Sequence, residues 1–209
     1  MTTAFEAVES TEELIAALEN ATAGTKIDAT GLTLNPTGSL DTTVSIPAGV
    51  TIKGASFASG SQCYLVTTGS GEDVVFEDCS FDGPGFGMFV IAGNDQDGAA
   101  MVFDNCTFAG QVAPNFVQNS NGSATFNNCK FTVGSDNIGL VNCMGGTHTF
   151  NNCTFDYTGG ATFGSNQYVK WNAVNSYSER YSTAVILNGC TFINCGTQRY
   201  GSNSTLVKK

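Results

Sequence analysis

Cysteine is the chemically reactive residue that recurs most regularly in this sequence. Five of the 8 cysteines take the same place in a six-residue phrase, Phe-x-x-Cys-x-Phe, whose last copy begins with Leu187 instead of Phe. These five are Cys79, Cys106, Cys129, Cys153 and Cys190. Thiolates bind zinc or form disulfides, but the chain has no Cys-x-x-Cys pair and one histidine, so we expect no zinc site. We expect small buried thiols, and the phrase leaves open whether neighbouring thiols form disulfides.

The single histidine, His148, directly precedes Thr149 and Phe150. A catalytic histidine needs a nucleophile beside it and an acid that orients its ring. The repeat places no such pair near His148. We therefore expect a surface or structural histidine, with its side chain opposite to the inward phenylalanines or at the start of its strand.

Carboxylates form the remaining chemical candidates. Glu72 and Asp73 lie in one expected turn, and Asp95 and Asp97 lie in the next. Oxygen ligands of this kind hold calcium, although acids are also common in solvated turns. Solvated acids are the favoured interpretation, a cation site stays open, and no cofactor is expected.

The spacing of the phrase shows which elements position these side chains. Successive cysteines lie 27, 23, 24 and 37 residues apart, and a period in the twenties is typical of a solenoid of stacked units. Alternation within each phrase predicts two short strands with inward Phe and Cys side chains. The inward residues include Phe81, Phe108, Phe131, Phe155 and Phe192. Between the two strands stand Asp78, Asn105, Asn128, Asn152 and Gly189, which favour a left-handed backbone at a sharp bend.

A third strand is expected after each phrase, at 64–66, 88–91, 115–118, 138–142 and 168–171. Ahead of the repeat, Ser10-Thr-Glu-Glu13 matches a capping box and predicts a helix that ends near Gly24 and covers the first coil. We therefore divide the chain into an N-terminal segment with this helix (1–24), a parallel β-helix (25–195) and a C-terminal tail or cap (196–209).

The repeated order of strand, Asn-rich corner, strand, loop and strand resembles the pectate-lyase-like right-handed parallel β-helix superfamily over residues 25–195. The resemblance implies an all-β, three-walled, right-handed solenoid. It implies no single activity, because members include polysaccharide lyases and hydrolases, adhesins and phage proteins. The acidic, histidine and Arg-x-Lys signatures of polygalacturonase-like members are absent, so we expect a non-catalytic member.

Residues 156–184 break the regular repeat and lengthen its loops. The sign of the charge changes at the same point. Residues 1–155 carry 3 basic and 16 acidic residues, whereas residues 156–209 carry 5 basic and 2 acidic residues. Because Tyr, Trp and Arg anchor interfaces, we expect a docking surface or an end cap here. The candidate interface residues are Tyr168, Lys170, Trp171, Tyr177, Arg180, Tyr181 and Arg199.

These observations favour a non-enzymatic structural protein, such as a phage capsid decoration or another virion accessory protein that docks through its C-terminal end. A polysaccharide-binding or polysaccharide-degrading protein is the alternative, and a surface adhesin is the second. We expect a protein partner or self-association, for instance as a trimer, while carbohydrate stays open. A pI of 4.2 argues against nucleic acid. No signal peptide or membrane span is visible, so we expect synthesis in the cytoplasm and a final place on a virion surface.

Overall fold

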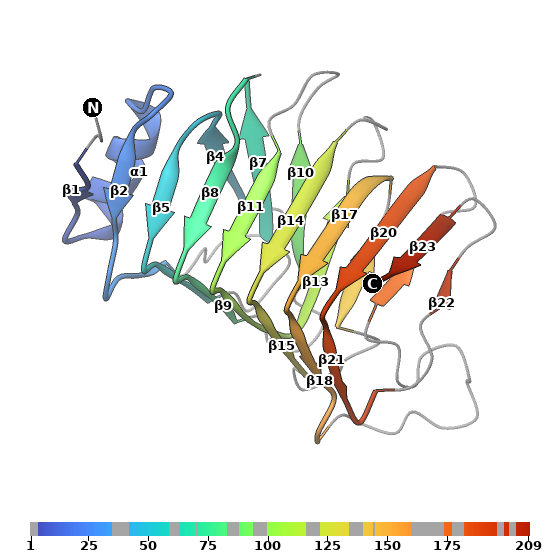
Figure 1. Cartoon of the computed structure of the whole chain (residues 1–209). Helices are drawn as coiled ribbons and strands as arrows, with labels where there is room; N and C mark the ends of the chain where they lie inside the picture. The colour runs from blue at the N-terminus through green and yellow to red at the C-terminus, as the bar shows by residue number, and fades with distance from the viewer. Residues whose placement is uncertain are drawn as a thin grey trace.

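Over its described residues, the chain folds as an all-β, right-handed parallel β-helix with one short helix (Figure 1). The computed structural model describes residues 4–34, 42–58, 63–69, 71–82, 88–93, 100–115, 122–133, 140–143, 145–159, 174–176, 182–195, 199–200 and 204–209. The fold class expected from the repeat is confirmed.

Three parallel sheets form the walls of the solenoid. Sheet A has nine strands: β1 (Glu6–Ala7), β2 (Lys26–Asp28), β5 (Thr51–Lys53), β8 (Val74–Glu77), β11 (Met101–Asp104), β14 (Ser123–Asn127), β17 (Gly146–Asn151), β20 (Thr183–Asn188) and β23 (Ser204–Lys208). Sheet B has seven strands: β3 (Thr33–Leu34), β6 (Ser56–Ala58), β9 (Ser80–Asp82), β12 (Thr107–Ala109), β15 (Lys130–Thr132), β18 (Thr154–Asp156) and β21 (Thr191–Ile193). Sheet C has seven strands: β4 (Thr42–Pro47), β7 (Cys63–Thr68), β10 (Met88–Gly93), β13 (Gln111–Asn115), β16 (Val141–Cys143), β19 (Val174–Ser176) and β22 (Arg199–Tyr200).

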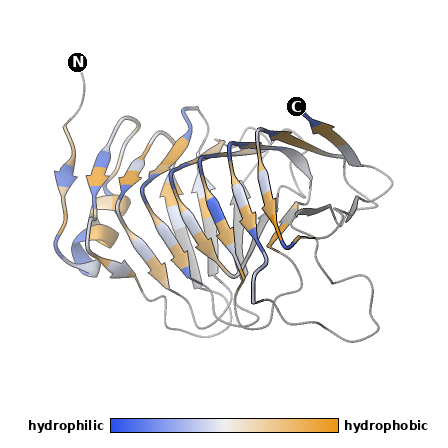
Figure 2. Cartoon of the chain, turned by 60° about the horizontal axis from the view of Figure 1, so that its bottom comes forward, coloured by the Kyte–Doolittle hydropathy of each residue, from blue (hydrophilic) through white to orange (hydrophobic). Residues whose placement is uncertain are grey.

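The chain visits sheets A, B and C in turn, so each strand pairs with the equivalent strands of the coils before and after it. The register keeps equivalent residues side by side: Phe103 pairs with Phe76 on one side and with Phe126 on the other. Equivalent side chains of successive coils therefore stack along the axis of the solenoid. Hydrophobic and hydrophilic residues alternate along the strands, as Figure 2 shows.

The corner between sheets A and B has the left-handed backbone that the sequence predicts. Asp78, Asn105, Asn128 and Asn152 have φ values of 53–55°, and Gly189 has 60°. Their backbone N–H groups still donate to the next coil; Asn105, for example, donates to the Asn127 carbonyl at 2.9 Å. The corner therefore bends the chain without breaking the hydrogen bonds that run between coils.

Two columns of phenylalanine rings fill the core. One column comes from sheet A (Phe76, Phe103, Phe126, Phe150), and the other from sheet B (Phe57, Phe81, Phe108, Phe131, Phe155, Phe192). Within a column the ring centroids lie 4.8–5.1 Å apart and the rings are nearly parallel. The two columns meet edge to face, as between Phe81 and Phe103 at 5.7 Å. Both arrangements are favourable for aromatic rings, and they tie each coil to its neighbours.

The third wall agrees with the sequence in part. β7, β10 and β16 overlap the expected strands at 64–66, 88–91 and 138–142. β13 spans Gln111–Asn115 and pairs with β10, so it begins four residues before the strand expected at 115–118, of which residues 116–118 lie outside the described residues. Residues 168–171 lie outside the described residues, and the strand that pairs with β16 is β19.

The N-terminal helix begins as predicted. α1 spans Thr11–Glu19, and its N-cap Ser10 accepts a hydrogen bond from the Glu13 backbone N–H at 3.1 Å. The helix ends earlier than expected, at Glu19. Leu14 and Leu18 are buried against the first coils, so the helix covers the end of the core. At the other end, β22 and β23 extend sheets C and A into the segment expected to be a tail.

Candidate functional site

The repeated cysteines form a stack of free thiols at the corner between sheets A and B; Cys190 is half-buried and the other four are buried. The free cysteines include all five of the repeat, together with Cys143 and Cys195. Each repeated Sγ lies near two backbone carbonyl oxygens: that of Cys129 is 3.4 Å from the Asn127 oxygen and 3.3 Å from the Phe103 oxygen of the preceding coil. Because a thiol carries one proton, it donates to one of these at a time. The repeated thiols therefore form hydrogen bonds with backbone carbonyl groups at the corner.

Thiol chemistry is suppressed in this setting. The neighbouring Cys129 thiol and burial raise the pKa of Cys153 to about 12. Burial alone raises the pKa of Cys143 well above its usual value. Since the thiolate is the nucleophile and the metal ligand, Cys143 and Cys153 are unreactive at neutral pH. The bonds of Cys129 to Cys106 and Cys153 lower its pKa instead, and burial is what keeps reagents from this thiol.

His148 is structural, and its predicted orientation is wrong. It lies two residues before Phe150 on β17, and a spacing of two puts both side chains on the inner face. The ring is fully buried, and its Nε2–H group donates to the Gly145 carbonyl oxygen at 2.6 Å. The Gly145 N–H donates in turn to the Thr183 hydroxyl at 2.9 Å. Burial lowers the pKa of His148 to about 4, so the ring is neutral at pH 7.

A ladder of side-chain amides runs along the outer face of sheet A, next to the corner, and sequence reasoning missed it. Asn127 donates to Asp104 Oδ1 at 2.6 Å, and Asn151 donates to Asn127 Oδ1 at 2.7 Å. Asn188 continues the row with a bond to Asn151 Oδ1 at 2.7 Å. The signal was present in the sequence, because these residues all stand two places before the repeated cysteine.

The acidic residues divide between described and undescribed parts of the chain. Glu72 and Asp73 are exposed in the turn before β8, as expected for solvated acids. Asp95 and Asp97 lie outside the described residues. Within the described ranges, no group of three or more His, Cys, Asp or Glu side chains is placed to hold a metal ion.

The candidate interface residues of the sequence fall mostly outside the described part of the chain. This applies to Tyr168, Lys170, Trp171, Tyr177, Arg180 and Tyr181. Arg199 is the exception, because its backbone forms β22 and pairs with Asn175 of β19. The structure therefore places the backbone of one of the seven, at the last strand of sheet C.

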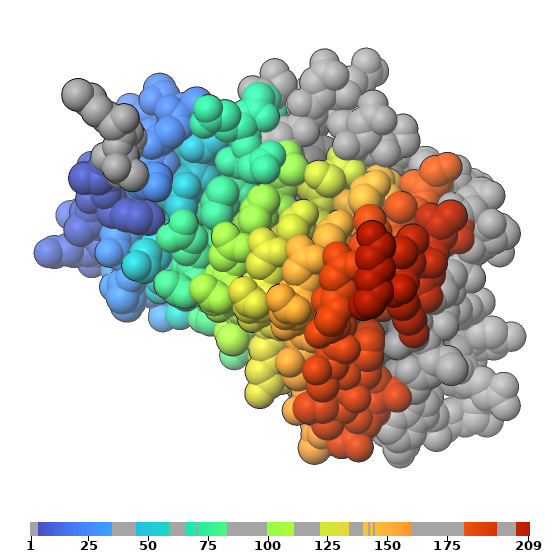
Figure 3. Space-filling view, in the orientation of Figure 1, coloured from blue at the N-terminus to red at the C-terminus, as the bar shows by residue number. Residues whose placement is uncertain are grey.

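The described C-terminal end has its own surface features. Phe192 is the last ring of the sheet B column: it stacks on Phe155 at 5.1 Å but is only half-buried. The Lys208 ammonium lies 5.8 Å from the centroid of the Phe192 ring, a cation–π contact across strands β21 and β23. Ile193 and Val207, on the same two strands, are exposed. This end thus combines apolar surface with positive charge, and Figure 3 shows it opposite the N-terminal end.

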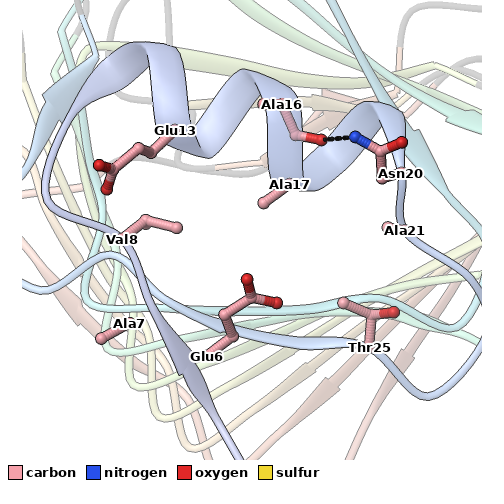
Figure 4. A pocket seen from close by; sticks show the side chains of 9 residues that line it. All are labelled: Glu6, Ala7, Val8, Glu13, Ala16, Ala17, Asn20, Ala21 and Thr25. Atoms are coloured by element: carbon pink, nitrogen blue, oxygen red, sulfur yellow. Dashed lines mark hydrogen bonds between the residues drawn. The ribbon is translucent and has the colours of Figure 1, made fainter.

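A pocket of about 530 Å³ lies at the N-terminal end, between β1 and α1. Its wall is formed by Val8, Thr25, Asn20 and small alanines, and its two charged residues are Glu6 and Glu13. The Glu6 side chain points into the space between the strand and the helix (Figure 4). Glu13 accepts a hydrogen bond from the Glu9 backbone N–H at 2.7 Å, so its carboxylate also stabilises the start of the helix.

No family model, no curated protein and no solved structure matches the chain. Among the described residues, no helix has the length and apolar character needed to cross a membrane. The functional argument therefore depends on the geometry of the solenoid and on the sequence.

Proposed function

We propose that this chain is a non-enzymatic structural protein, a non-catalytic member of the pectate-lyase-like superfamily that attaches to a larger assembly through its C-terminal end. The observation that carries the proposal is that the side chains capable of chemistry (the thiols, the amides and the histidine) bind to the chain's own backbone and side chains. The repeated thiols donate to corner carbonyls, the amides of Asn127, Asn151 and Asn188 bond to neighbouring coils, and His148 is buried. The thiols and the amides stabilise the contact between coils, and the His148 ring bonds to Gly145 within its own coil.

The core supports a load-carrying role. Rings of adjacent coils stack at 4.8–5.1 Å, and the backbone hydrogen bonds continue through the corners. Each coil contacts its neighbours over three sheets, so bending the solenoid would separate stacked rings and strand pairs together. A stiff body of this kind suits a protein that projects from a surface, and a phage virion is the assembly that the sequence favours.

The C-terminal end supports the choice of attachment point. Ile193 and Val207 expose apolar surface beside Lys208, and β23 is the outermost described strand of sheet A. The outermost strand of a sheet is a place where a strand of another chain adds to it. The undescribed residues Lys170, Trp171 and Arg180 add positive and aromatic character to this part of the sequence.

Two assays test the proposal. The purified protein should release no unsaturated product and no reducing ends from pectate or alginate, with or without calcium; turnover of either polymer would refute the non-enzymatic role. For attachment, the variant Lys170→Glu/Arg180→Glu/Trp171→Ala should lose binding to its assembly or to other copies while its circular dichroism stays unchanged. Unchanged association in this variant would refute docking through the C-terminal end.

The neighbourhood of the gene separates the proposed context from the alternative. Capsid and portal genes beside it would support attachment to a virion. Genes for sugar transport would instead favour a protein that acts on polysaccharides.

A further inference from the structure

The exposed large hydrophobic side chains lie at the two ends of the solenoid. Among the described residues they are Phe5 and Ile15, at 37% and 47% exposure, and Ile193 and Val207, at 40% and 41%. Phe5 precedes β1 and Ile15 lies on α1, whereas Ile193 and Val207 lie on the last described strands of sheets B and A. The described coils between them carry no such residue.

The exposure of Val207 follows from its place in sheet A. The strand register puts Val207 in one outward row with Val75, Val102 and Ile186. The latter three are half-buried, since strands on both sides cover their flanks. Val207 has a described strand on one side only. One more strand beside β23 would give Val207 the surroundings that the rest of its row already has.

The two terminal segments of the sequence carry opposite charge, and the cations described beside the N-terminal segment, Lys26 and Lys53, lie over the Phe5 ring. The N-terminal segment of residues 1–24 contains five glutamates and no Lys or Arg: Glu6, Glu9, Glu12, Glu13 and Glu19. Residues 182–209 contain Arg199, Lys208 and Lys209 and no Asp or Glu. Surfaces of opposite charge attract each other and disfavour contact between like ends.

We propose that the partner of the C-terminal end is the N-terminal end of a second copy of this chain. In this arrangement, which rests on the proposed docking role, β23 of one copy pairs in parallel with β1 of the next and continues sheet A. The direction of the strands permits this, because β1 and β23 belong to the same parallel sheet. The contact joins two different surfaces, so it repeats from copy to copy and builds a row of stacked solenoids.

The N-terminal pocket completes the receiving surface. It opens between β1 and α1 and presents the carboxylate of Glu6 above small apolar residues. Lys208, the last residue of β23, holds its ammonium group over the Phe192 ring, whereas the next residue, Lys209, supplies an exposed ammonium group on a long apolar stem. A lysine side chain fits such a pocket, since its stem contacts alanines while its charge meets a carboxylate.

A charge exchange between the ends tests the arrangement. One variant carries Glu6→Lys and Glu19→Lys, and the other carries Lys208→Glu and Lys209→Glu; each variant then sets like charges against each other at the exchanged positions. We expect the average mass of the unmodified protein to rise with concentration at low salt in analytical ultracentrifugation. Each variant should associate at least about tenfold more weakly than the unmodified protein. An equimolar mixture of the two variants should regain association, because the unmodified C-terminal end of the first variant then meets the unmodified N-terminal end of the second, and the exchanged positions again face opposite charges.

Matched controls keep the charge changes but leave the ends intact. Glu72→Lys and Lys130→Glu alter exposed residues in the middle coils and should associate like the unmodified protein. A protein that stays monomeric at every concentration overturns the inference but leaves C-terminal docking to another component untouched. Self-association that Lys208→Glu/Lys209→Glu abolishes and Glu6→Lys/Glu19→Lys does not change overturns it as well, while supporting the docking end. A mixture that fails to regain association also overturns it.

Discussion

The side-chain amide of Asn151 donates to Oδ1 of Asn127, one coil earlier, at 2.7 Å. Asn127 in turn donates a hydrogen bond to Asp104 Oδ1, so half-buried side chains of three successive coils are linked. Replacing the middle residue therefore affects two bonds rather than one.

Asn127→Ala should lower the free energy of unfolding by about 1–3 kcal/mol, because it leaves an acceptor of Asp104 and a donor of Asn151 without their partners. Chemical denaturation followed by circular dichroism measures this. Thr125→Val, two residues away on the same outer face, is the control and should change stability by less than about 0.5 kcal/mol. Equal effects of the two substitutions would contradict a role of the amide ladder in stability.

The corner residue Asn128, with φ of 54°, gives a second prediction. Asn128→Ala should cost about 1–2 kcal/mol, since an alanine side chain clashes in the left-handed region. Asn128→Gly should stay within a few tenths of a kcal/mol of the unmodified protein, since glycine takes this conformation freely. The comparison of their denaturation midpoints is the measurement, and a glycine variant as unstable as the alanine variant would argue against backbone conformation as the cause.

The inner thiols should be unreactive until the protein unfolds. We expect this of Cys79, Cys106, Cys129, Cys143 and Cys153, which are at most 2% exposed. In a variant with Cys63, Cys190 and Cys195 replaced by Ser, a maleimide probe at pH 7 should label no thiol of the folded chain, and all five in denaturant. Rapid labelling of the folded variant, observed by mass spectrometry, would contradict the burial of the stack.

His148 should make stability depend on pH. Its pKa of about 4 in the folded state lies below the ordinary value of 6.5, so the unfolded chain binds the proton more readily. The stabilisation is complete above pH 6.5 and is lost as the pH falls toward 4, by about 3 kcal/mol in total.

His148→Gln isolates this effect, because the chain has one histidine and the carboxylates titrate equally in both proteins. Subtracting the unfolding free energies of the variant from those of the unmodified protein, between pH 4 and pH 7.5, should leave a curve that rises through this range. A flat difference would show that the histidine is equally basic in the folded and unfolded states.

The parts of the fold that repeat could be predicted from the sequence. Asn105 and Asn128 indicated the left-handed corners, and the Phe-x-x-Cys-x-Phe phrase indicated the two inner strands, because both follow from local backbone and side-chain preferences. The position of β13 was missed for the opposite reason. The strand was expected to begin at Asn115, but the pairing of Val112 with Phe89 of the preceding coil already places residues from Gln111 onward in the sheet, and the local pattern does not show this pairing.

The features near the candidate site were harder to predict. The amide ladder requires Asn127 and Asn151 to be aligned across coils, and this alignment depends on the register of the whole sheet. The orientation of His148 was within reach of the sequence, because two-residue alternation from Phe150 turns it inward. The bond from the ring to the Gly145 carbonyl, which lets the core hold a polar side chain, depends on the turn before β17 and has no signal in the alternation.

The stacked rings also fix the distance that each coil adds to the length of the molecule. Phe103 and Phe126 occupy equivalent places 23 residues apart, and their rings lie 4.9 Å apart. A duplication of residues 107–129 would present the same corner, rings and thiol to both neighbours. Duplication or deletion of one coil therefore changes the length of this protein by one ring spacing and leaves the surfaces at both ends unaltered.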